Sequence, residues 1–346
     1  MSSNRSNGDL VELFRKELEL CGIKPGETVG VLSEPGHQLE YVKASMTAAR
    51  EVGASAFNLN LPPKTDAAAG AQGQGVGNSS LADSRVALEA FKSADLMISL
   101  FFLLFSKEQI EIQQSGTRVL SILDPPEVLM RMFPDRNLRE RVEAGQRRLN
   151  AAHELRFTNP AGTDVTYRLG AYEALTLYGY TDTPGRWDHW PSGFVFSGAD
   201  ETGVDGRVVM DRGDIIHPFG TFVRDPIDFT IREGRIVELK GGTDAETMRR
   251  YIESFNDPRA WAISHIGWGL NDKARWTGEG VGAFGAEGRS YYGNVLFSTG
   301  PNVELGGKND THCHLDLPMR ACTLYLDDEL IVKDGKIVPE DMRVAG

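Results

Sequence analysis

Apolar residues in the first 150 positions follow two alternating patterns, one typical of buried strands and one typical of amphipathic helices. Short apolar runs predict strands at residues 27–32, 55–61, 95–103 and 118–123. Helical spacing, or a proline pair that suits a first helical turn, predicts helices at residues 38–52, 81–94 and 125–132. Strands that alternate with helices favour a mostly parallel sheet covered by helices.

The pattern changes near residue 150. A charged helical segment at residues 137–155 is suited to join two domains, and beyond it short strand signals and tight turns dominate. Hairpin turns are predicted at residues 204–206 and 232–234, and a helix at 243–255. The sequence therefore predicts an α/β domain over residues 1–150, followed by a β-rich, α+β-like domain over 151–346.

Composition narrows the class of protein. The net charge of -12 argues against nucleic acid or an anionic membrane as the main partner. The longest apolar run, Leu96–Phe105, is about half the length that crosses a bilayer. The N-terminus shows no secretory signal, and three cysteines fit no disulfide framework. We therefore expect a cytoplasmic protein with small-molecule partners.

A Pro-, Ala- and Gly-rich segment covers residues 62–80 and predicts a surface loop. Its glycines at 73, 75 and 77 do not match the dinucleotide-binding spacing, and no lysine follows at the spacing of a phosphate-binding loop. A phosphate site is therefore not predicted here.

Two of the seven histidines stand out by their local sequence. His189 lies in GRWDHWPSG, where an aromatic-flanked Asp-His pair in a glycine-bounded loop fits a role in a site and a structural role equally well. His265 lies in SHIGWGL, where the glycines permit close approach of backbone or ligand, although a core histidine fits the pattern as well. His37 and His153 are expected to be solvated, and His217 to be structural.

The segment THCHLDLP, residues 311–318, concentrates possible metal ligands. In a strand, His312, His314 and Asp316 would share one face and Cys313 the other. Nitrogen and oxygen donors on one face favour a metal half-site with open positions, as catalysis requires. A polar strand face beside a loop is the alternative. The residues alone do not choose among the three donors, and they also allow a distant histidine to replace one.

Several long segments resemble a known family. GYTDTPGRWDHWPSGF, FNDPRAWAISHIGWGL, LDPPEVLMRMFP and YYGNVLFSTGPNVELGGKNDTHCHLDLP are similar to the 2,5-dihydroxypyridine 5,6-dioxygenases of bacterial nicotinic acid breakdown. The resemblance runs over nearly the whole length. A more distant similarity reaches the thermophilic metallo-aminopeptidases, which share the terminal His-x-Asp element.

The resemblance implies a non-haem Fe(II) enzyme. Its ligands would be His265, His314 and Asp316, which leaves one face of the iron open, and His312 would lie outside the metal set. The expected reaction opens the ring of 2,5-dihydroxypyridine, or of a related hydroxylated aromatic, with O2. The family product is N-formylmaleamate, and family members are homo-oligomers.

The resemblance also points to the substrate pocket. Ser298 falls at a substrate-contacting position, and His189 matches a pocket histidine to which we assign proton handling as the catalytic residue. Leu104, Phe105 and Leu177 are expected to contact the substrate. The family has histidine in place of Phe105 and glutamate in place of Leu177, which implies a different or bulkier aromatic substrate, or proton transfer by His189.

Two other functions remain open on the sequence. A metal-dependent aminopeptidase-like hydrolase would need a second group of ligands for a two-metal site, for which Glu253, Glu304 and His312 are the nearest candidates. A non-catalytic binding protein that kept the fold is the other possibility.

Overall fold

The computed structural model describes residues 7–62, 76–77, 79–101, 103–217, 219–277 and 285–344. These residues form two compact units. The first comprises residues 7–62, 76–133 and 179–191, and the second comprises residues 134–178 and 192–344, within the described ranges. Most of the glycine-rich segment, for which a surface loop was predicted, lies outside the described residues. None of the described helices is long and apolar enough to cross a membrane.

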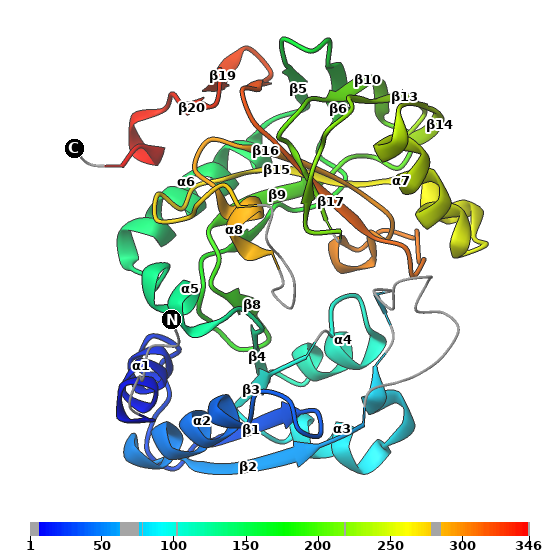
Figure 1. Cartoon of the computed structure of the whole chain (residues 1–346). Helices are drawn as coiled ribbons and strands as arrows, with labels where there is room; N and C mark the ends of the chain where they lie inside the picture. The colour runs from blue at the N-terminus through cyan, green and yellow to red at the C-terminus, as the bar shows by residue number, and fades with distance from the viewer. Residues whose placement is uncertain are drawn as a thin grey trace. The chain divides into compact units, whose positions relative to one another are not determined.

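The first unit is built on a five-stranded parallel sheet with the order β2-β1-β3-β4-β8. Its strands are β1 (Thr28–Ser33), β2 (Ser55–Asn60), β3 (Leu96–Ser99), β4 (Arg118–Ile122) and β8 (Trp187–Trp190). Its helices are α1 (Asn7–Leu20), α2 (Leu39–Glu51), α3 (Arg85–Lys92), α4 (Lys107–Gln114) and α5 (Pro126–Arg131) (Figure 1). The predicted parallel sheet is confirmed, with β3 shorter than the apolar run around it.

Helices cover both faces of this sheet, because side chains of successive strand residues point to opposite faces. On one face, strand residues pack with Phe91 of α3 and Ile112 of α4. On the other face, the ring of Phe14 in α1 lies 5.4 Å from Tyr41 in α2 and 5.4 Å from Trp190 in β8. Each large apolar side chain buried in this way contributes about 1.5–3 kcal/mol.

Strand β8 was not predicted. It pairs in parallel with β4, and Ser121 stands opposite His189. His189 therefore lies in a buried strand, and the prediction that it lies in a glycine-bounded loop is wrong. Residues 179–191 belong to the first compact unit, and the domain boundary near residue 150 stays a prediction.

The second unit contains an eight-stranded antiparallel sheet with the order β14-β13-β10-β6-β5-β18-β19-β20. Its strands are β5 (Glu154–Thr158), β6 (Asp164–Arg168), β10 (Val204–Met210), β13 (Ile227–Arg232), β14 (Arg235–Gly241), β18 (Thr323–Leu326), β19 (Glu329–Lys333) and β20 (Lys336–Ile337). The turn at 232–234 is confirmed, with positive φ at Glu233 and Gly234. The turn predicted at 204–206 is wrong, because these residues lie inside β10. Gly206 is required by close packing instead, since a Cβ there would stand 2.3 Å from the carbonyl oxygen of Asp164.

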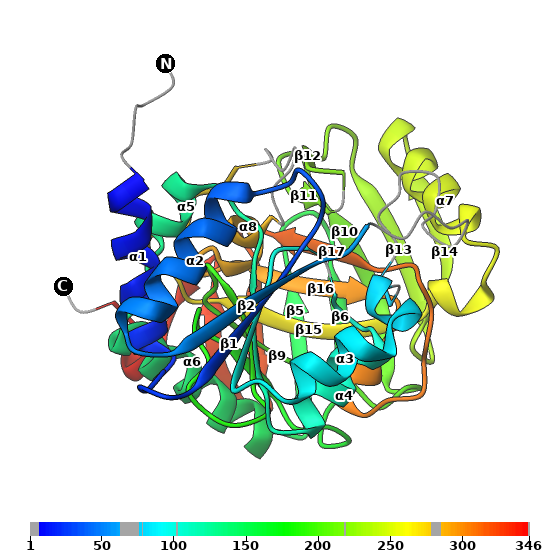
Figure 2. The ribbon, with the colours of Figure 1, turned by 90° about the horizontal axis from the view of Figure 1, so that it is seen from below.

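A five-stranded antiparallel sheet with the order β17-β16-β15-β9-β7 completes the second unit, and Figure 2 shows β15, β16 and β17 side by side. Its strands are β7 (Leu175–Leu177), β9 (Phe194–Gly198), β15 (Ile263–Gly269), β16 (Val295–Thr299) and β17 (Leu315–Met319). Smaller elements are β11 (Ile215–Ile216), β12 (Thr221–Phe222), α6 (Arg136–Ala151), α7 (Thr243–Ser254) and α8 (Ala286–Ser290). The two large sheets touch through Phe229 and Phe297, whose ring centroids are 5.4 Å apart.

Candidate metal centre

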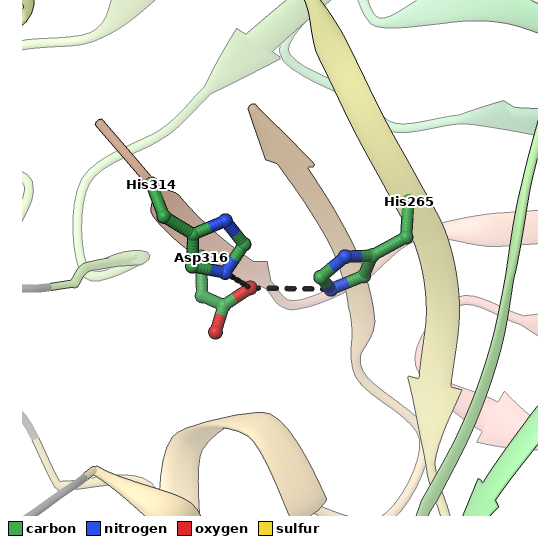
Figure 3. A group of neighbouring side chains, drawn as sticks. All are labelled: His265, His314 and Asp316. Atoms are coloured by element: carbon green, nitrogen blue, oxygen red, sulfur yellow. Dashed lines mark ion pairs between the residues drawn. The ribbon is translucent and has the colours of Figure 1, made fainter. Parts of the chain in front are cut away.

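Strands β15 and β17 bring two imidazoles and one carboxylate together. His265 comes from β15, Asp316 from β17, and His314 directly precedes β17. One ligand atom of each residue lies within 4.8 Å of the others. The Oδ1 atom of Asp316 stands 3.2 Å from the Nε2 atom of each histidine (Figure 3). All three side chains are at most 8% exposed.

A β-bulge and two glycines position His265. The register of β15 against β16 shifts between Ile263 and Ile266, and such a bulge re-aims the side chain beside it. A Cβ on Gly267 would stand 2.0 Å from the carbonyl oxygen of Val195, and a Cβ on Gly269 2.3 Å from that of Tyr291. The glycines around His265 therefore serve close approach of backbone, the first of the two possibilities that the sequence offered.

His314 is held by its second ring nitrogen. Its Nδ1 atom lies 3.1 Å from the carbonyl oxygen of Thr299, which can only accept a hydrogen bond. The proton therefore sits on Nδ1, and the Nε2 lone pair points toward Asp316, as a metal ligand requires.

The first residues of the THCHLDLP segment do not form the strand that was assumed for them. Strand β17 begins at Leu315, so the alternation assumed from residue 311 is wrong for His312 and Cys313. Neither belongs to the cluster of His265, His314 and Asp316. Cys313 is fully buried, and burial raises its pKa to about 12.

Charge in the cluster is balanced by a buried arginine. Burial lowers the pKa of His265, although the carboxylate of Asp316 opposes this effect. Burial alone would raise the pKa of Asp316, but the imidazoles of His314 and His265 bring it well below its usual range. The Nη1 atom of Arg289 lies 3.1 Å from the other carboxylate oxygen, Oδ2. The carboxylate is therefore ionised, with Oδ1 turned toward the histidines.

The donor set fits a divalent transition metal. Two imidazole nitrogens and one carboxylate oxygen converge from a rigid sheet, and three ligands of this kind leave coordination positions open. Within the described ranges, this is the one group of three or more His, Cys, Asp and Glu side chains that is close enough to share a metal ion.

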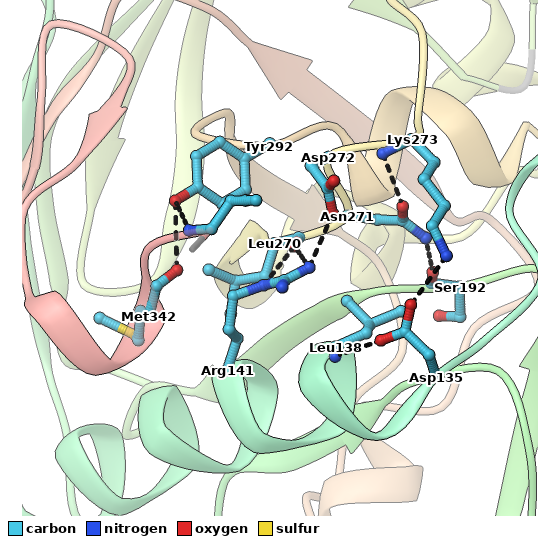
Figure 4. Close-up of polar contacts among 11 residues, drawn as sticks. Asp135, Leu138, Arg141, Ser192, Leu270, Asn271, Asp272, Lys273, Tyr292 and Met342 are labelled. Atoms are coloured by element: carbon cyan, nitrogen blue, oxygen red, sulfur yellow. Dashed lines mark hydrogen bonds and ion pairs between the residues drawn. The ribbon is translucent and has the colours of Figure 1, made fainter. Parts of the chain in front are cut away.

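Hydrogen bonds to helix α6 hold the segment that follows β15 (Figure 4). The guanidinium of Arg141 donates to the carbonyl oxygen of Leu270 at 3.2 Å and to the carboxylate of Asp272 at 2.7 Å. The ammonium of Lys273 lies 2.8 Å from the carboxylate of Asp135. The chain leaving β15 is therefore fixed within a few residues of His265.

Arg289 was not singled out by the sequence. It lies in α8, whose carbonyl oxygens at Gly288 and Arg289 accept hydrogen bonds from the amide nitrogen of Asn294. The oxygen of the same Asn294 side chain accepts the backbone N–H of Gly269 at 2.6 Å. A lone arginine in AEGRS looks like a surface residue, so no local signal marks its role.

Other predicted site residues divide between the two units. Ser298 and Leu177 lie in the second unit, in β16 and at the end of β7. His189, Leu104 and Phe105 belong to the first unit. His189, Phe105 and Leu177 are buried, and Leu104 is partly exposed. The backbone of His217 makes a structural hydrogen bond: its N–H donates to the carbonyl oxygen of Asp316 at 3.1 Å.

Gly300 is expected to be intolerant of substitution. It has a φ of 111°, and a Cβ would stand 2.1 Å from the carbonyl oxygen of Cys313, the residue before His314. We expect Gly300→Ala to lower the free energy of unfolding by about 3 kcal/mol, the sum of backbone strain and displacement of the neighbouring chain. Urea titration measures the effect.

Gly306 offers a matched control. Its φ is 90°, but no atom lies within 4 Å of an added Cβ. Gly306→Ala should therefore cost only the left-handed strain, about 1 kcal/mol. Equal losses in the two variants would show that the contact with Cys313 is unimportant.

The fold and the cluster together define a class: a mixed α/β protein with a candidate two-histidine, one-carboxylate metal centre on an antiparallel sheet. Sequence comparison gives the family. The model of the 2,5-dihydroxypyridine 5,6-dioxygenase family matches residues 9–339, so the chain belongs to this family of ring-cleaving dioxygenases. A curated relative, the 2,5-dihydroxypyridine 5,6-dioxygenase of Pseudomonas putida KT2440, is 41% identical over 345 residues, 98% of this chain and 99% of that protein.

A solved structure of a relative agrees with this assignment. The 2,5-dihydroxypyridine dioxygenase from Pseudomonas putida KT2440 matches with a TM-score of 0.94 and 41% identity, over 98% of this chain and 100% of that one. Wild-type AmpT from Thermus thermophilus matches with a TM-score of 0.67 and 16% identity, over 96% of this chain and 99% of that one. The second likeness shows a shared fold alone. The family resemblance and the mixed α/β fold inferred from the sequence are confirmed.

Proposed function

We propose that this chain uses Fe(II), held by His265, His314 and Asp316, to open the ring of 2,5-dihydroxypyridine, or of a related hydroxylated aromatic, with O2. The buried donor set carries the proposal, because it supplies three ligands from one side. The product from the pyridine would be N-formylmaleamate. When bound, ferrous iron would supply Lewis acidity toward a ring hydroxyl group and the redox chemistry that a reaction with O2 requires.

The residues around the cluster set its charge. As metal ligands, His265 and His314 would bind through neutral imidazoles and add no charge, and the carboxylate of Asp316 is offset by the guanidinium of Arg289 at 3.1 Å. The protein part of the site is therefore close to neutral. Such a site favours the deprotonated form of a hydroxylated ring, because the positive charge of a divalent ion is not cancelled by the protein.

His189 is proposed to handle the substrate proton. Its Nδ1 atom lies 2.8 Å from the carbonyl oxygen of Pro191, so Nδ1 carries the hydrogen and Nε2 is the basic nitrogen. Its backbone N–H donates to the carboxylate of Asp188 at 2.8 Å, which fixes the strand at this point. A neutral, oriented imidazole is suited to act as a general base.

Ring specificity is proposed to depend on Leu104, Phe105 and Leu177. Phe105 has a φ of 62°, a left-handed conformation that is uncommon for residues other than glycine and less unfavourable for histidine. Strain of this kind often marks functional positions. Apolar side chains at 105 and 177 would remove two polar partners for a pyridine ring, which favours a different or bulkier aromatic substrate.

Oxygen uptake tests the proposed function. The metal-free protein would be reconstituted with Fe(II) without air, then mixed with O2 and 2,5-dihydroxypyridine or a panel of hydroxylated pyridines and phenols. We expect uptake with at least one ring compound and none without iron. Absence of uptake with every compound would refute the proposal. Uptake with another ring and not the pyridine would support the argument from Phe105 and Leu177.

The metal ligands can be tested separately from the substrate. We expect His265→Ala to lose iron, because it removes one of three ligands, and His312→Ala to keep it, because His312 lies outside the cluster. Iron content after gel filtration gives the answer. Retention of iron by the His265 variant, or its loss from the His312 variant, would overturn the proposed ligand set.

Location and assembly are part of the same proposal. Three cysteines, all buried and free, suit a reducing compartment, and we propose a cytoplasmic enzyme. A homo-oligomer is proposed from the family resemblance, and sedimentation velocity would test it.

A metal-dependent aminopeptidase-like hydrolase is the second candidate. The fold shared with AmpT permits it. A two-metal site needs more ligands than the single cluster found among the described residues. Glu253 and Glu304, considered on the sequence, do not join that cluster, and Glu253 is exposed. Two metal ions per chain together with peptide hydrolysis would favour this candidate.

A further inference from the structure

Strand β16 supplies no metal ligand, yet it holds both ligand histidines. It lies between β15 and β17 in the sheet. The hydroxyl oxygen of Ser298 accepts the backbone N–H of His265 at 2.9 Å, and the hydroxyl faces the carbonyl oxygen of His265 at 3.3 Å. The carbonyl oxygen of the next residue, Thr299, accepts Nδ1–H of His314.

The β-bulge explains why a hydroxyl is needed at this position. Ile263 stands opposite Thr299, and Ile266 opposite Phe297, so Ser264 and His265 together face Ser298 alone. The regular ladder is interrupted there, and a backbone N–H and C=O would be left without strand partners. The side chain of Ser298 serves both groups of His265 in place of the missing ladder bonds.

Ser298 also lies on the ligand side of the sheet. Its direct partner across the β16–β17 pair is Asp316, and residues directly opposite each other project from the same face. Ser298 is nevertheless fully buried, and its hydroxyl is turned to the backbone of His265. Its position beside the ligands therefore does not by itself make it a substrate contact.

We propose that Ser298 is a positioning residue, which fixes the bulge that aims His265 at the metal, and that this is its main role rather than contact with the substrate. Groups that orient a metal ligand set the metal affinity without touching the ion. The inference rests on the proposed metal site and does not depend on which ring is the substrate.

Metal affinity is the readout that separates this role from a substrate contact. The metal-free wild type, Ser298→Ala and Ser298→Thr would be titrated with Co(II) without air, with the visible absorption of the bound ion as the signal. We expect Ser298→Ala to bind Co(II) about 10- to 100-fold more weakly. Ser298→Thr keeps the hydroxyl and should stay within about threefold of the wild type.

Ser197→Ala is the matched control. Ser197 is a buried serine of β9 in the same sheet, and its hydroxyl bonds the carbonyl oxygens of Tyr172 and Gly198 at 3.4 and 3.3 Å. This variant should bind Co(II) like the wild type. Thermal unfolding of each metal-free variant shows whether it is folded. If Ser298→Ala does not fold, the Co(II) titration of Ser298→Thr is used to test the inference.

Three outcomes would overturn the inference. The first is a folded Ser298→Ala variant with unchanged Co(II) affinity, above all if its KM for the ring substrate rises. The second is a Ser298→Thr variant that folds but binds Co(II) as weakly as expected for alanine. The third is an equal loss in Ser197→Ala. Failure of the wild type to bind Co(II) at all would instead refute the proposed metal site.

Discussion

Replacing Asp316 with alanine is expected to abolish iron binding and to lower the stability of the metal-free protein by about 3 kcal/mol. The first effect follows because the cluster would lose its only anionic ligand. The second follows because the guanidinium of Arg289, 5% exposed, would lose its carboxylate partner at 3.1 Å. A buried charge left without its partner is strongly destabilising.

A double variant separates the two effects. Asp316→Ala combined with Arg289→Met removes the uncompensated charge, so urea unfolding of the metal-free protein should recover most of the lost stability. Iron content should remain at zero. If the double variant is as unstable as Asp316→Ala, the ion pair is not the cause of the loss. If either variant retains iron, Asp316 is not a ligand.

Glu17→Gln is expected to stabilise the protein in alkaline solution. Glu17 of α1 is 1% exposed, and its Oε2 atom has no hydrogen-bond partner in the described structure. Burial, with a further contribution from the Asp188 carboxylate, raises its pKa well above the ordinary 4.5. The folded state therefore keeps a proton that the unfolded chain releases.

The direction of the pH dependence follows from this shift. The stabilising contribution of the raised pKa is complete below the unfolded-state value of 4.5. It is lost as the pH rises through the folded-state value, at up to about 1.4 kcal/mol per pH unit. Glutamine has no proton to lose, so the variant should gain up to about 3 kcal/mol over the wild type across two such pH units.

Urea unfolding at a series of pH values from 5 to about 9 measures the difference. Glu19→Gln is the control on the same helix, because the side chain of Glu19 is 53% exposed and pairs with Arg15 at the surface. Its stability should follow the wild type at every pH. A wild-type curve parallel to that of Glu17→Gln would show that Glu17 is not the group responsible.

Local pattern was enough to predict most of the first unit. Strands β1, β2 and β4 are short apolar runs, and α2 shows helical spacing, so their assignment needs no distant contact. Strand β8 was missed because Trp187–Trp190 is flanked by Gly185 and Pro191, which predict a loop. Its strand conformation depends on pairing with β4, more than sixty residues earlier.

The candidate site shows the same limit. His314 and Asp316 are near neighbours in sequence and could be found from the spacing of their donors. His265 could not be derived in that way, because its place depends on the order of β15, β16 and β17 in the sheet. Arg289 contacts Asp316, and Ser298 contacts the backbone of His265, across long separations in sequence. No periodic pattern marks such contacts, whereas family resemblance supplied His265 directly.

The return of residues 179–191 to the first unit limits how the protein can be cut into fragments. A fragment that stops near residue 150 would lack β8 and leave β4 as the outer strand of its sheet. The apolar residues Val119, Leu120 and Ile122, fully buried in the intact chain, would then border an unpaired backbone edge. Open apolar edges of this kind promote aggregation. A recombinant N-terminal fragment is therefore expected to be insoluble unless a strand equivalent to 187–190 is fused to it.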